Sequence, residues 1–229
     1  MIAPFSKGDI GFVLGYAPLE KKYKNFIDKI LIFENLAQDA FFASCAGNGL
    51  TMSCVGRNIA FRKKYFLDVN GYEDMKNIKS GDDDLLLHRI IHSKKCKVAY
   101  VITKYSNVYS RPPENVKEFT NQRLRFASKG ELYYRLFYIS NELKIILPFL
   151  LLINIIAIIS LVSFFLNPEM ILLFPWFIKT CAELIFLRVF CNIFNLNFDY
   201  YSFFILSLLH PFYILVFSLI GPFKKYSWK

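Results

Sequence analysis

Glycine-rich stretches, internal repeats and paired cysteines are all missing from this sequence of 229 residues. Ten glycines, nine prolines and no repeat exclude fibrous and solenoid folds. The five cysteines form no Cys-x-x-Cys pair and no Cys/His cluster. We therefore expect neither a disulfide framework nor a zinc site, which fits a reducing cytoplasmic compartment. The first residues contain no apolar stretch typical of a secretory signal peptide.

Charge is scarce in the last third of the chain. Residues 1–143 hold 22 Lys/Arg and 15 Asp/Glu, whereas residues 144–229 hold only six and three. Overall the chain is 55% hydrophobic, and its Leu, Ile and Phe are concentrated in the second part. Such a composition does not form an ordinary water-exposed surface. The sequence therefore predicts a soluble domain over residues 1–138 and a membrane-embedded helical region over residues 139–229.

The apolar region divides into three helical segments, at about residues 145–166, 170–194 and 200–221. The first and third are free of charge and long enough to cross the hydrocarbon core. The middle one carries Lys179, Glu183 and Arg188, and the first two are spaced to pair on one helix face. It is either a third span or a helix lying at the interface. Lys and Arg flank both ends of the region, which places both ends in the cytoplasm and favours an even number of crossings. The number of full crossings stays open.

The first 138 residues show mixed periodicity. Helices are expected over residues 23–42, 63–69, 82–92 and 114–138, where apolar residues recur at helical spacing. Strands are expected over residues 10–15, 51–55, 97–102 and 105–109. This alternation indicates an α/β domain.

Three adjacent carboxylates, Asp82, Asp83 and Asp84, begin the predicted helix 82–92. Acidic residues in a first turn suit the helix dipole, and Ser80 or Asp82 can cap the helix. The structural interpretation is a well-capped helix with a leucine core. The functional one is a carboxylate that faces a cleft and acts as a general base or metal ligand. Repulsion among the three charges raises the pKa of at least one.

A second polar cluster lies on the predicted helix 114–138. Gln122 and Arg125 share one face, and Phe126 is next to them. An arginine provides a two-pronged cation for a diphosphate, and an aromatic ring packs on a sugar face. The alternative is a basic helix beside the membrane that is attracted to anionic lipid head groups.

These clusters follow one another in a recognisable order. The motifs are Gly56-x-Asn58, Gly71-Tyr72-Glu73, Gly81-Asp82-Asp83 and Gln122-x-x-Arg125-Phe126, followed by apolar helices. The series resembles the C-terminal half of a membrane-bound family 2 glycosyltransferase, the inverting group that includes cellulose and hyaluronan synthases. The resemblance implies a partial GT-A-like domain, a nucleotide-sugar donor, a glycan or lipid-linked acceptor, and a location in the cell inner (plasma) membrane with the soluble domain in the cytoplasm.

The resemblance also implies residue roles. Asp83 falls where the family has its catalytic base, and Asp82 stands where the family often has Glu. Gln122 and Arg125 match a motif near the donor diphosphate and the acceptor sugar. Phe126 replaces the usual Trp, so an aromatic face remains but the indole N–H is lost. Gly56 and Asn58 match a loop on the acceptor side and complete the expected substrate-binding set.

The sequence departs from the family pattern in the part that binds the nucleotide-sugar donor. The complete family enzyme binds Mg²⁺ or Mn²⁺ through an Asp-x-Asp motif that precedes all of these residues, and this chain has no such motif. We expect the isolated chain to bind nucleotide sugars poorly and to have little transferase activity. The alternative is a catalytically incomplete membrane subunit, or a remnant, that needs a separate donor-binding chain.

Two other function classes fit the sequence less well. The net charge of +10 and the basic flanks suit a lipid-binding membrane anchor, but that interpretation leaves the ordered Asp and Gln-Arg motifs without a role. Nucleic-acid binding is not expected, because no recognition motif is present. His88 and His92 are spaced for a metal ion on one helix, but Arg89 and neighbouring lysines make that site electropositive. We expect no metal there.

Overall fold

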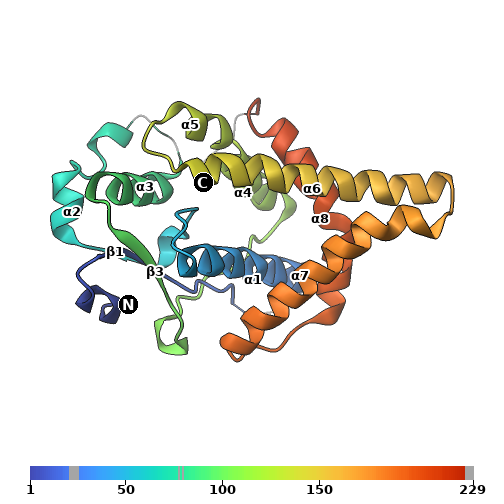
Figure 1. Ribbon diagram of the computed structural model, residues 1–229, viewed down its shortest axis with the longest axis horizontal. Coiled ribbons are helices and arrows are strands. Elements are labelled where there is room, and N and C mark those ends of the chain that lie inside the picture. Colours follow the sequence, from blue (N-terminus) through green and yellow to red (C-terminus); the bar gives the residue numbers. More distant parts are fainter. Residues whose placement is uncertain (21–25, 77, 79, 225–229) are drawn as a thin grey trace.

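A computed structural model describes residues 1–20, 26–76, 78 and 80–224. A small mixed sheet with helices around it forms one part, and three long apolar helices form the C-terminal part (Figure 1). The sheet has the order β2-β1-β3. The central strand β1 (Ile10–Gly15) pairs antiparallel with β2 (Ile59–Phe61) and parallel with β3 (Lys97–Val101). Every residue of β1 is buried, as expected for a central strand that carries a nearly unbroken apolar sequence.

Helix α3 (Asp82–Lys94) supplies the core that packs against the sheet. Its residues Leu85, Leu86 and Leu87 are completely buried, together with Phe12 of β1. The helix begins after Gly81, which has a φ of 91°, a conformation that glycine adopts without strain. Gly81 is thus the N-cap residue, and the prediction that Ser80 or Asp82 would cap the helix is wrong. The short helix α2 (Lys63–Asp68) packs against α3.

Helix α1 (Phe26–Gly47) connects the soluble part to the apolar helices. It packs against β3, α7 and α8, and it contributes Phe33, Leu36 and Ala40 to a second buried cluster. Phe190 of α7 and Phe203 of α8 belong to the same cluster. The apolar helices are therefore fixed to the soluble part by packing as well as by the chain itself.

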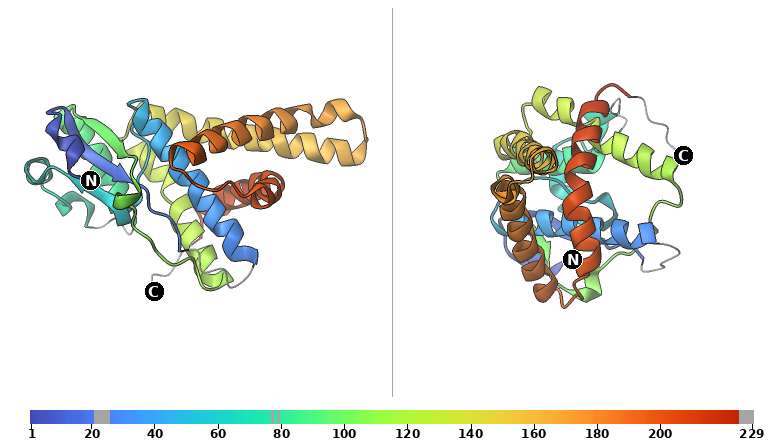
Figure 2. Two further views of the ribbon diagram at one scale, coloured as in Figure 1. Left: turned by 90° about the horizontal axis from the view of Figure 1, so that it is seen from below. Right: turned by 90° about the vertical axis from the view of Figure 1, so that its right-hand side faces the viewer.

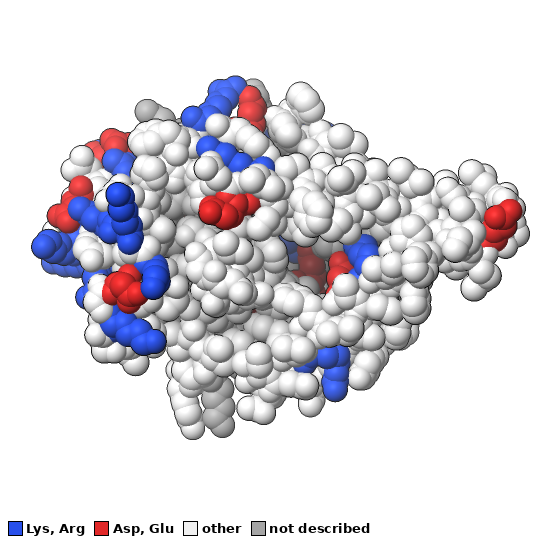
Figure 3. Space-filling model, viewed as in Figure 1, with Lys and Arg blue, Asp and Glu red and all other residues white. Residues whose placement is uncertain are grey.

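The C-terminal helices are long and apolar enough to cross a membrane. They are α6 (Asn141–Leu166), α7 (Phe174–Ile193) with the short helix η5 (Met170–Leu173) before it, and α8 (Tyr200–Ile220). This confirms the predicted apolar region. Helices α6 and α7 form a hairpin that projects from the rest of the molecule in the left-hand view of Figure 2, and the right-hand view shows α8 running across it. On the face seen in Figure 3, the outer part of the hairpin carries charge only at its tip.

The charged pair expected in the middle apolar segment is present. Lys179 Nζ lies 2.7 Å from Glu183 Oε1, one helical turn further along α7. The Lys179 side chain is only 6% exposed, whereas that of Glu183 is 39% exposed. Pairing of this kind is how an apolar helix accommodates two charges.

Two predicted strands are not strands. Residues 51–55 belong to no strand, and Ser53 and Cys54 bind the Asp84 side chain instead of a neighbouring strand. Residues 105 and 106 belong to the short helix η4 (Lys104–Ser106), and the residues after it run beside residues 16–18. Pro18 has no N–H to continue a ladder there, so pairing is limited to isolated bonds.

Two of the predicted helices also differ clearly in extent. Helix α1 continues to Gly47 rather than ending at residue 42, and residues 23–25 lie outside the described part. The expected helix 114–138 is two helices, α4 (Val116–Ala127) and α5 (Gly130–Arg135). The break lies at Ser128 and Lys129. The Lys129 side chain there forms an ion pair with a buried carboxylate, and Gly130 begins the second helix.

Candidate active site

A cavity of about 800 Å³ lies between the soluble part and the apolar helices. Six of the seven residues predicted for the site line it: Gly56, Asp82, Asp83, Gln122, Arg125 and Phe126. They come from three segments, namely the loop before β2, the first turn of α3, and α4. Folding therefore brings together motifs that are up to 70 residues apart in the sequence. The volume is typical of a small-molecule site.

The Asp83 carboxylate is held by backbone amides at the start of α3. Its Oδ2 atom accepts a hydrogen bond from Gly56 N at 2.8 Å, and its Oδ1 atom accepts one from Asp84 N at 2.9 Å. Within the described residues no ion pair involves Asp83. Burial raises its pKa, and the neighbouring Asp84 charge adds to this, while Lys129 opposes it. A fixed carboxylate with a raised pKa that faces a cavity has the properties of a general base.

Only glycine fits at position 56, because the backbone there lies so close to the Asp83 carboxylate. A Cβ atom at position 56 would lie 2.7 Å from Asp83 Oδ2, nearer than carbon and oxygen can approach without displacement. A side chain there would push the carboxylate out of its place. Gly56 thus acts by allowing the backbone to bind Asp83.

Asp84 is the residue of the acidic cluster that the sequence did not single out. Its carboxylate is 1% exposed and forms an ion pair with Lys129. It also accepts hydrogen bonds from Ser53 Oγ, from Cys54 N at 2.9 Å and from Tyr133 Oη at 3.0 Å. Burial alone would raise the pKa of Asp84, but Lys129 and the other donors lower it below its usual value. Asp84 is therefore a charged structural anchor, whereas Asp83 next to it faces the cavity.

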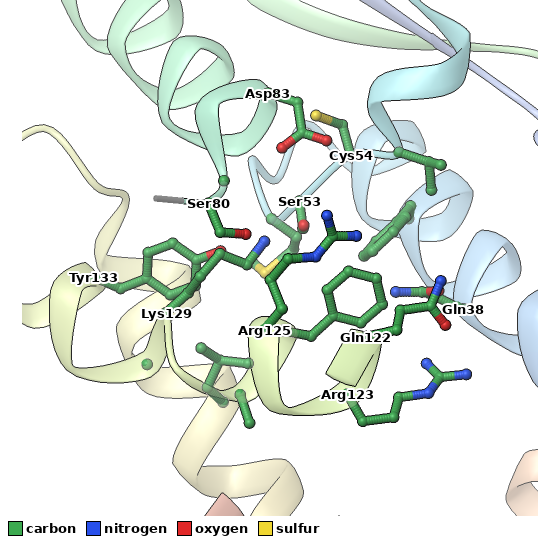
Figure 4. A pocket seen from close by; sticks show the side chains of 18 of the residues that line it. Gln38, Ser53, Cys54, Ser80, Asp83, Gln122, Arg123, Arg125, Lys129 and Tyr133 are labelled. Atoms are coloured by element: carbon green, nitrogen blue, oxygen red, sulfur yellow. The ribbon is translucent and has the colours of Figure 1, made fainter. Parts of the chain in front are cut away.

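Helix α4 presents the second polar cluster to the same cavity. Asn115 caps the helix, because its Oδ1 atom accepts a hydrogen bond from Glu118 N at 2.9 Å. Figure 4 shows the Arg125 guanidinium directed toward Ser53 and the Gln122 amide directed toward Gln38 of α1. The Arg125 guanidinium carbon also lies 5.5 Å from the centre of the Phe126 ring. The cavity wall thus combines a cation, amides and an aromatic face.

Arg123 of α4 also lines the cavity, but its guanidinium is bound to a side chain of α1. Its Nη2 atom lies 2.7 Å from Glu34 Oε2 of α1, and both side chains are almost fully buried. The guanidinium carbon also lies 5.0 Å from the centre of the Phe119 ring. This ion pair fastens α4 to α1 and so fixes the face that carries Gln122 and Arg125.

Asn58 does not line the cavity, which corrects its expected place in the substrate site. Its Nδ2 atom donates hydrogen bonds to Tyr16 O at 2.8 Å and to Ser106 O at 2.7 Å. Both N–H groups are thereby used by backbone carbonyls. Asn58 instead joins the end of β1 to the segment after β3. It can therefore affect the site only by stabilising the surrounding structure.

Asp82 and the two histidines complete the sequence-predicted candidates. Asp82 is exposed at the cavity wall. His88 is buried, with Nε2 placed 2.8 Å from Met52 O and Nδ1 accepting from Ser140 N at 3.3 Å. The His92 ring packs against Phe137. No group of three His, Cys, Asp or Glu side chains in the described part of the chain is placed to hold a metal ion.

No protein-family model matches this chain, and no curated protein matches it. The function must therefore be argued from the cavity itself.

A second buried carboxylate, Asp39 of α1, lies behind the cavity wall. It is 1% exposed and accepts hydrogen bonds from Tyr100 Oη at 3.2 Å and Asn35 Nδ2 at 3.3 Å. Burial raises the pKa of Asp39 to about 7, although these donors and Arg57 act in the opposite direction. The folded protein therefore holds a proton at pH 5 to 7 that the unfolded chain has released.

This raised pKa makes stability depend on pH. Because the folded state binds the extra proton, the free energy of unfolding is expected to fall by roughly 2–3 kcal/mol between pH 5 and pH 8. Asp39→Asn removes the titrating group and should largely abolish that fall. Urea titrations followed by circular dichroism at both pH values measure it. The surface variant Asp68→Asn should keep the full fall, and an equal fall in Asp39→Asn would contradict the assignment.

Proposed function

We propose that this chain is part of a membrane-bound inverting glycosyltransferase, similar to family 2 enzymes of the GT-A type. It would transfer a sugar from a nucleotide sugar to a glycan or lipid-linked acceptor. The observation that carries this proposal is the meeting of Asp83 with Gln122, Arg125 and Phe126 in one cavity. A purely structural pocket has no need of this set, whereas sugar transfer uses a base, a cation and a sugar-binding surface.

In the proposed transfer reaction, Asp83 and Arg125 have different roles. Asp83 removes the proton from an acceptor hydroxyl, and that oxygen forms a bond to the anomeric carbon of the donor. The bond between that carbon and the diphosphate oxygen breaks on the opposite face, and its electron pair leaves with the nucleoside diphosphate. The anomeric configuration is inverted, and the proton passes from Asp83 to water. Arg125 is suited to the negative charge of the diphosphate.

The hydrogen bonds of Asp83 support its part in this step. Two backbone N–H groups hold the carboxylate in one orientation, which spares the cost of ordering it during the reaction. Its raised pKa makes it a stronger base than an ordinary aspartate. The resemblance implies Mg²⁺ or Mn²⁺ as well. Because the described residues offer no cluster that fits such an ion, no step is assigned to a metal here.

The apolar helices support a specific membrane placement. Helices α6 and α7 form a hairpin and thus provide an even number of crossings, while α8 runs across them as an interfacial helix would (Figure 2). Lys144 at the start of α6 and Lys224 after α8 then lie on the same side of the membrane. By the positive-inside rule this side is the cytoplasm. We propose the inner (plasma) membrane, with the sheet and cavity on its cytoplasmic face.

A second candidate is a membrane subunit that acts with a separate donor-binding chain. The sheet has three strands, and β3 forms one of its edges. Ile102, directly after β3, is 56% exposed, and Tyr105 is 88% exposed. An open strand edge beside exposed apolar side chains favours a protein partner.

The proposal is tested by measuring the transfer of radiolabelled sugar in membranes. Membranes from the cells that make this chain, with and without its gene, are supplied with a panel of radiolabelled nucleotide sugars. We expect one donor to give gene-dependent label in a lipid or polymer fraction, with inverted configuration by glycosidase digestion. Equal incorporation with and without the gene would contradict it. Titration of the purified chain with that donor separates the candidates, because micromolar binding would remove the need for a partner.

A further inference from the structure

The cavity that contains Asp83 extends along the membrane helices. Leu143, Leu147 and Leu151 of α6 line it. They are spaced four residues apart, so they form one face of the helix over about 12 Å of its length. Phe41 and Phe42 of α1 contribute to the same lining. One end of the cavity is thus polar and reactive, and the other is a wall of aliphatic and aromatic side chains.

The wall formed by α6 is held in place by an unusual contact. Pro148 has no N–H, so the carbonyl of Lys144 has no partner inside the helix. Tyr134 Oη donates a hydrogen bond to this oxygen at 2.7 Å. Tyr134 and Pro148 both line the cavity. The helix therefore crosses the cavity wall with its free backbone oxygen satisfied from α5, and its leucines keep facing the cavity.

We propose that this cavity binds a lipid-linked acceptor. The polar head presents a hydroxyl to Asp83, and the aliphatic chain lies along the leucine face of α6 and the phenylalanines of α1. This inference rests on the proposed function and narrows its acceptor to an amphiphile.

The composition of the two ends favours a lipid over a soluble glycan. A glycan in the apolar part would bury hydroxyl groups against leucine side chains that offer no hydrogen bond, which is unfavourable. An aliphatic chain has no such groups and gains from leaving water. The Asp83 carboxylate and the Gln122 amide favour a hydroxyl-bearing head at the other end. Leu151 lies one residue before Leu152, which is 52% exposed on the outer surface of α6, so a lipid chain in the cavity stays close to the bilayer.

Photolabelling of the full chain tests this directly. The protein is purified into phosphatidylcholine nanodiscs and labelled with dodecyl glucoside that carries a diazirine in its alkyl chain. We expect adducts on residues 143–151 of α6 and on residues 41–42 of α1. Leu151→Trp fills the cavity and should lower these adducts at least tenfold. Leu152→Trp is the matched control on the lipid-facing side and should leave them unchanged.

A second pair protects the test against misfolding of one variant. Leu147→Trp should act like Leu151→Trp, and Phe149→Trp, at a position that is 56% exposed, should act like Leu152→Trp. Circular dichroism and size-exclusion chromatography establish which variants are folded. Adducts confined to outward positions, or equal labelling in all variants, would overturn the inference. Loss of labelling in the presence of excess cellohexaose would also overturn it, in favour of a glycan occupant.

Photolabelling does not depend on catalysis. The proposed sugar transfer and the proposed lipid-linked acceptor can therefore fail independently. Cavity labelling without gene-dependent sugar transfer would remove the proposed function and leave a lipid site. Sugar transfer to a soluble glycan without cavity labelling would remove the lipid acceptor and leave the transferase.

Discussion

Asp83→Asn is expected to lower sugar transfer by roughly 10²–10⁴-fold, the usual contribution of a general base. The asparagine amide has almost the same shape as the carboxylate. Its oxygen can still accept the hydrogen bond that Gly56 N donates to Asp83 Oδ2. It cannot take up a proton, however, so the acceptor hydroxyl stays protonated. The loss should therefore appear in the rate of transfer and not in the folding of the protein.

Initial rates of label incorporation, in membranes from cells that carry the altered gene, measure this effect. Asp74→Asn is a suitable control, because Asp74 pairs with Arg89 at the surface and does not line the cavity. It should transfer sugar at the rate of the unaltered chain. An Asp83→Asn variant that keeps more than a tenth of the activity would exclude Asp83 as the base.

The pH profile provides a second readout for the same residue. Transfer requires ionised Asp83, and burial and the Asp84 charge raise the pKa of Asp83. Activity should therefore decline on the acid side at a pH above the ordinary aspartate value. The residual activity of Asp83→Asn should lack this decline. An unchanged acid limb in that variant would assign the titration to a different group.

The elements that the sequence predicted well are those with strong local signals. Strand β3 has β-branched residues within Lys97–Val101, and α3 has three acids in its first turn followed by leucines. The three apolar helices follow from length and composition alone. In each case the residues within one segment contain all the information that sets the element.

The errors arose where distant residues decide the local structure. The predicted helix 114–138 contains no proline and a single glycine, Gly130, and it breaks just before that glycine, where the Lys129 side chain reaches Asp84, 45 positions earlier in the sequence. From the sequence, Lys129 was only one of the basic residues that precede the first apolar helix. Likewise, residues 51–55 have strand-like composition, but their hydrogen bonds go to a side chain rather than to a strand.

The residues of the cavity also divide into those that local motifs predict and those that depend on distant parts of the chain. Ordered motifs nominated six residues that line it. Asn58 belongs to one of those motifs, but two backbone carbonyls occupy its amide, and no pattern in the sequence predicts that. The leucine wall of α6 was also not foreseen. A segment that is apolar on every side gives no indication of which face will turn toward a cavity, because packing against the rest of the fold decides it.

Lys129→Met is expected to destabilise the folded protein by about 3–5 kcal/mol, the usual cost of leaving one member of a buried ion pair without its partner. The Lys129 side chain is 12% exposed and that of Asp84 is 1% exposed. Ser53, Cys54 N and Tyr133 remain as donors to Asp84, but they do not neutralise its charge. Denaturant titration followed by circular dichroism measures the change. Lys97→Met removes an exposed partner of Asp9 and should have little effect.

The pH dependence of this defect distinguishes an unpaired charge from lost packing. In the unaltered protein the pKa of Asp84 is lowered, so its contribution to stability is present above the ordinary aspartate value and is lost only at lower pH. Without Lys129, burial raises the pKa of Asp84 instead, and protonation as the pH falls relieves part of the cost. The loss of stability relative to the unaltered protein should therefore be smaller at pH 5 than at pH 8. A second change, Asp84→Asn, should restore most of the loss at pH 8 because it removes the buried charge. A defect that is equal at both pH values, and that Asp84→Asn does not relieve, would show that Lys129 stabilises the fold by packing and not by its charge.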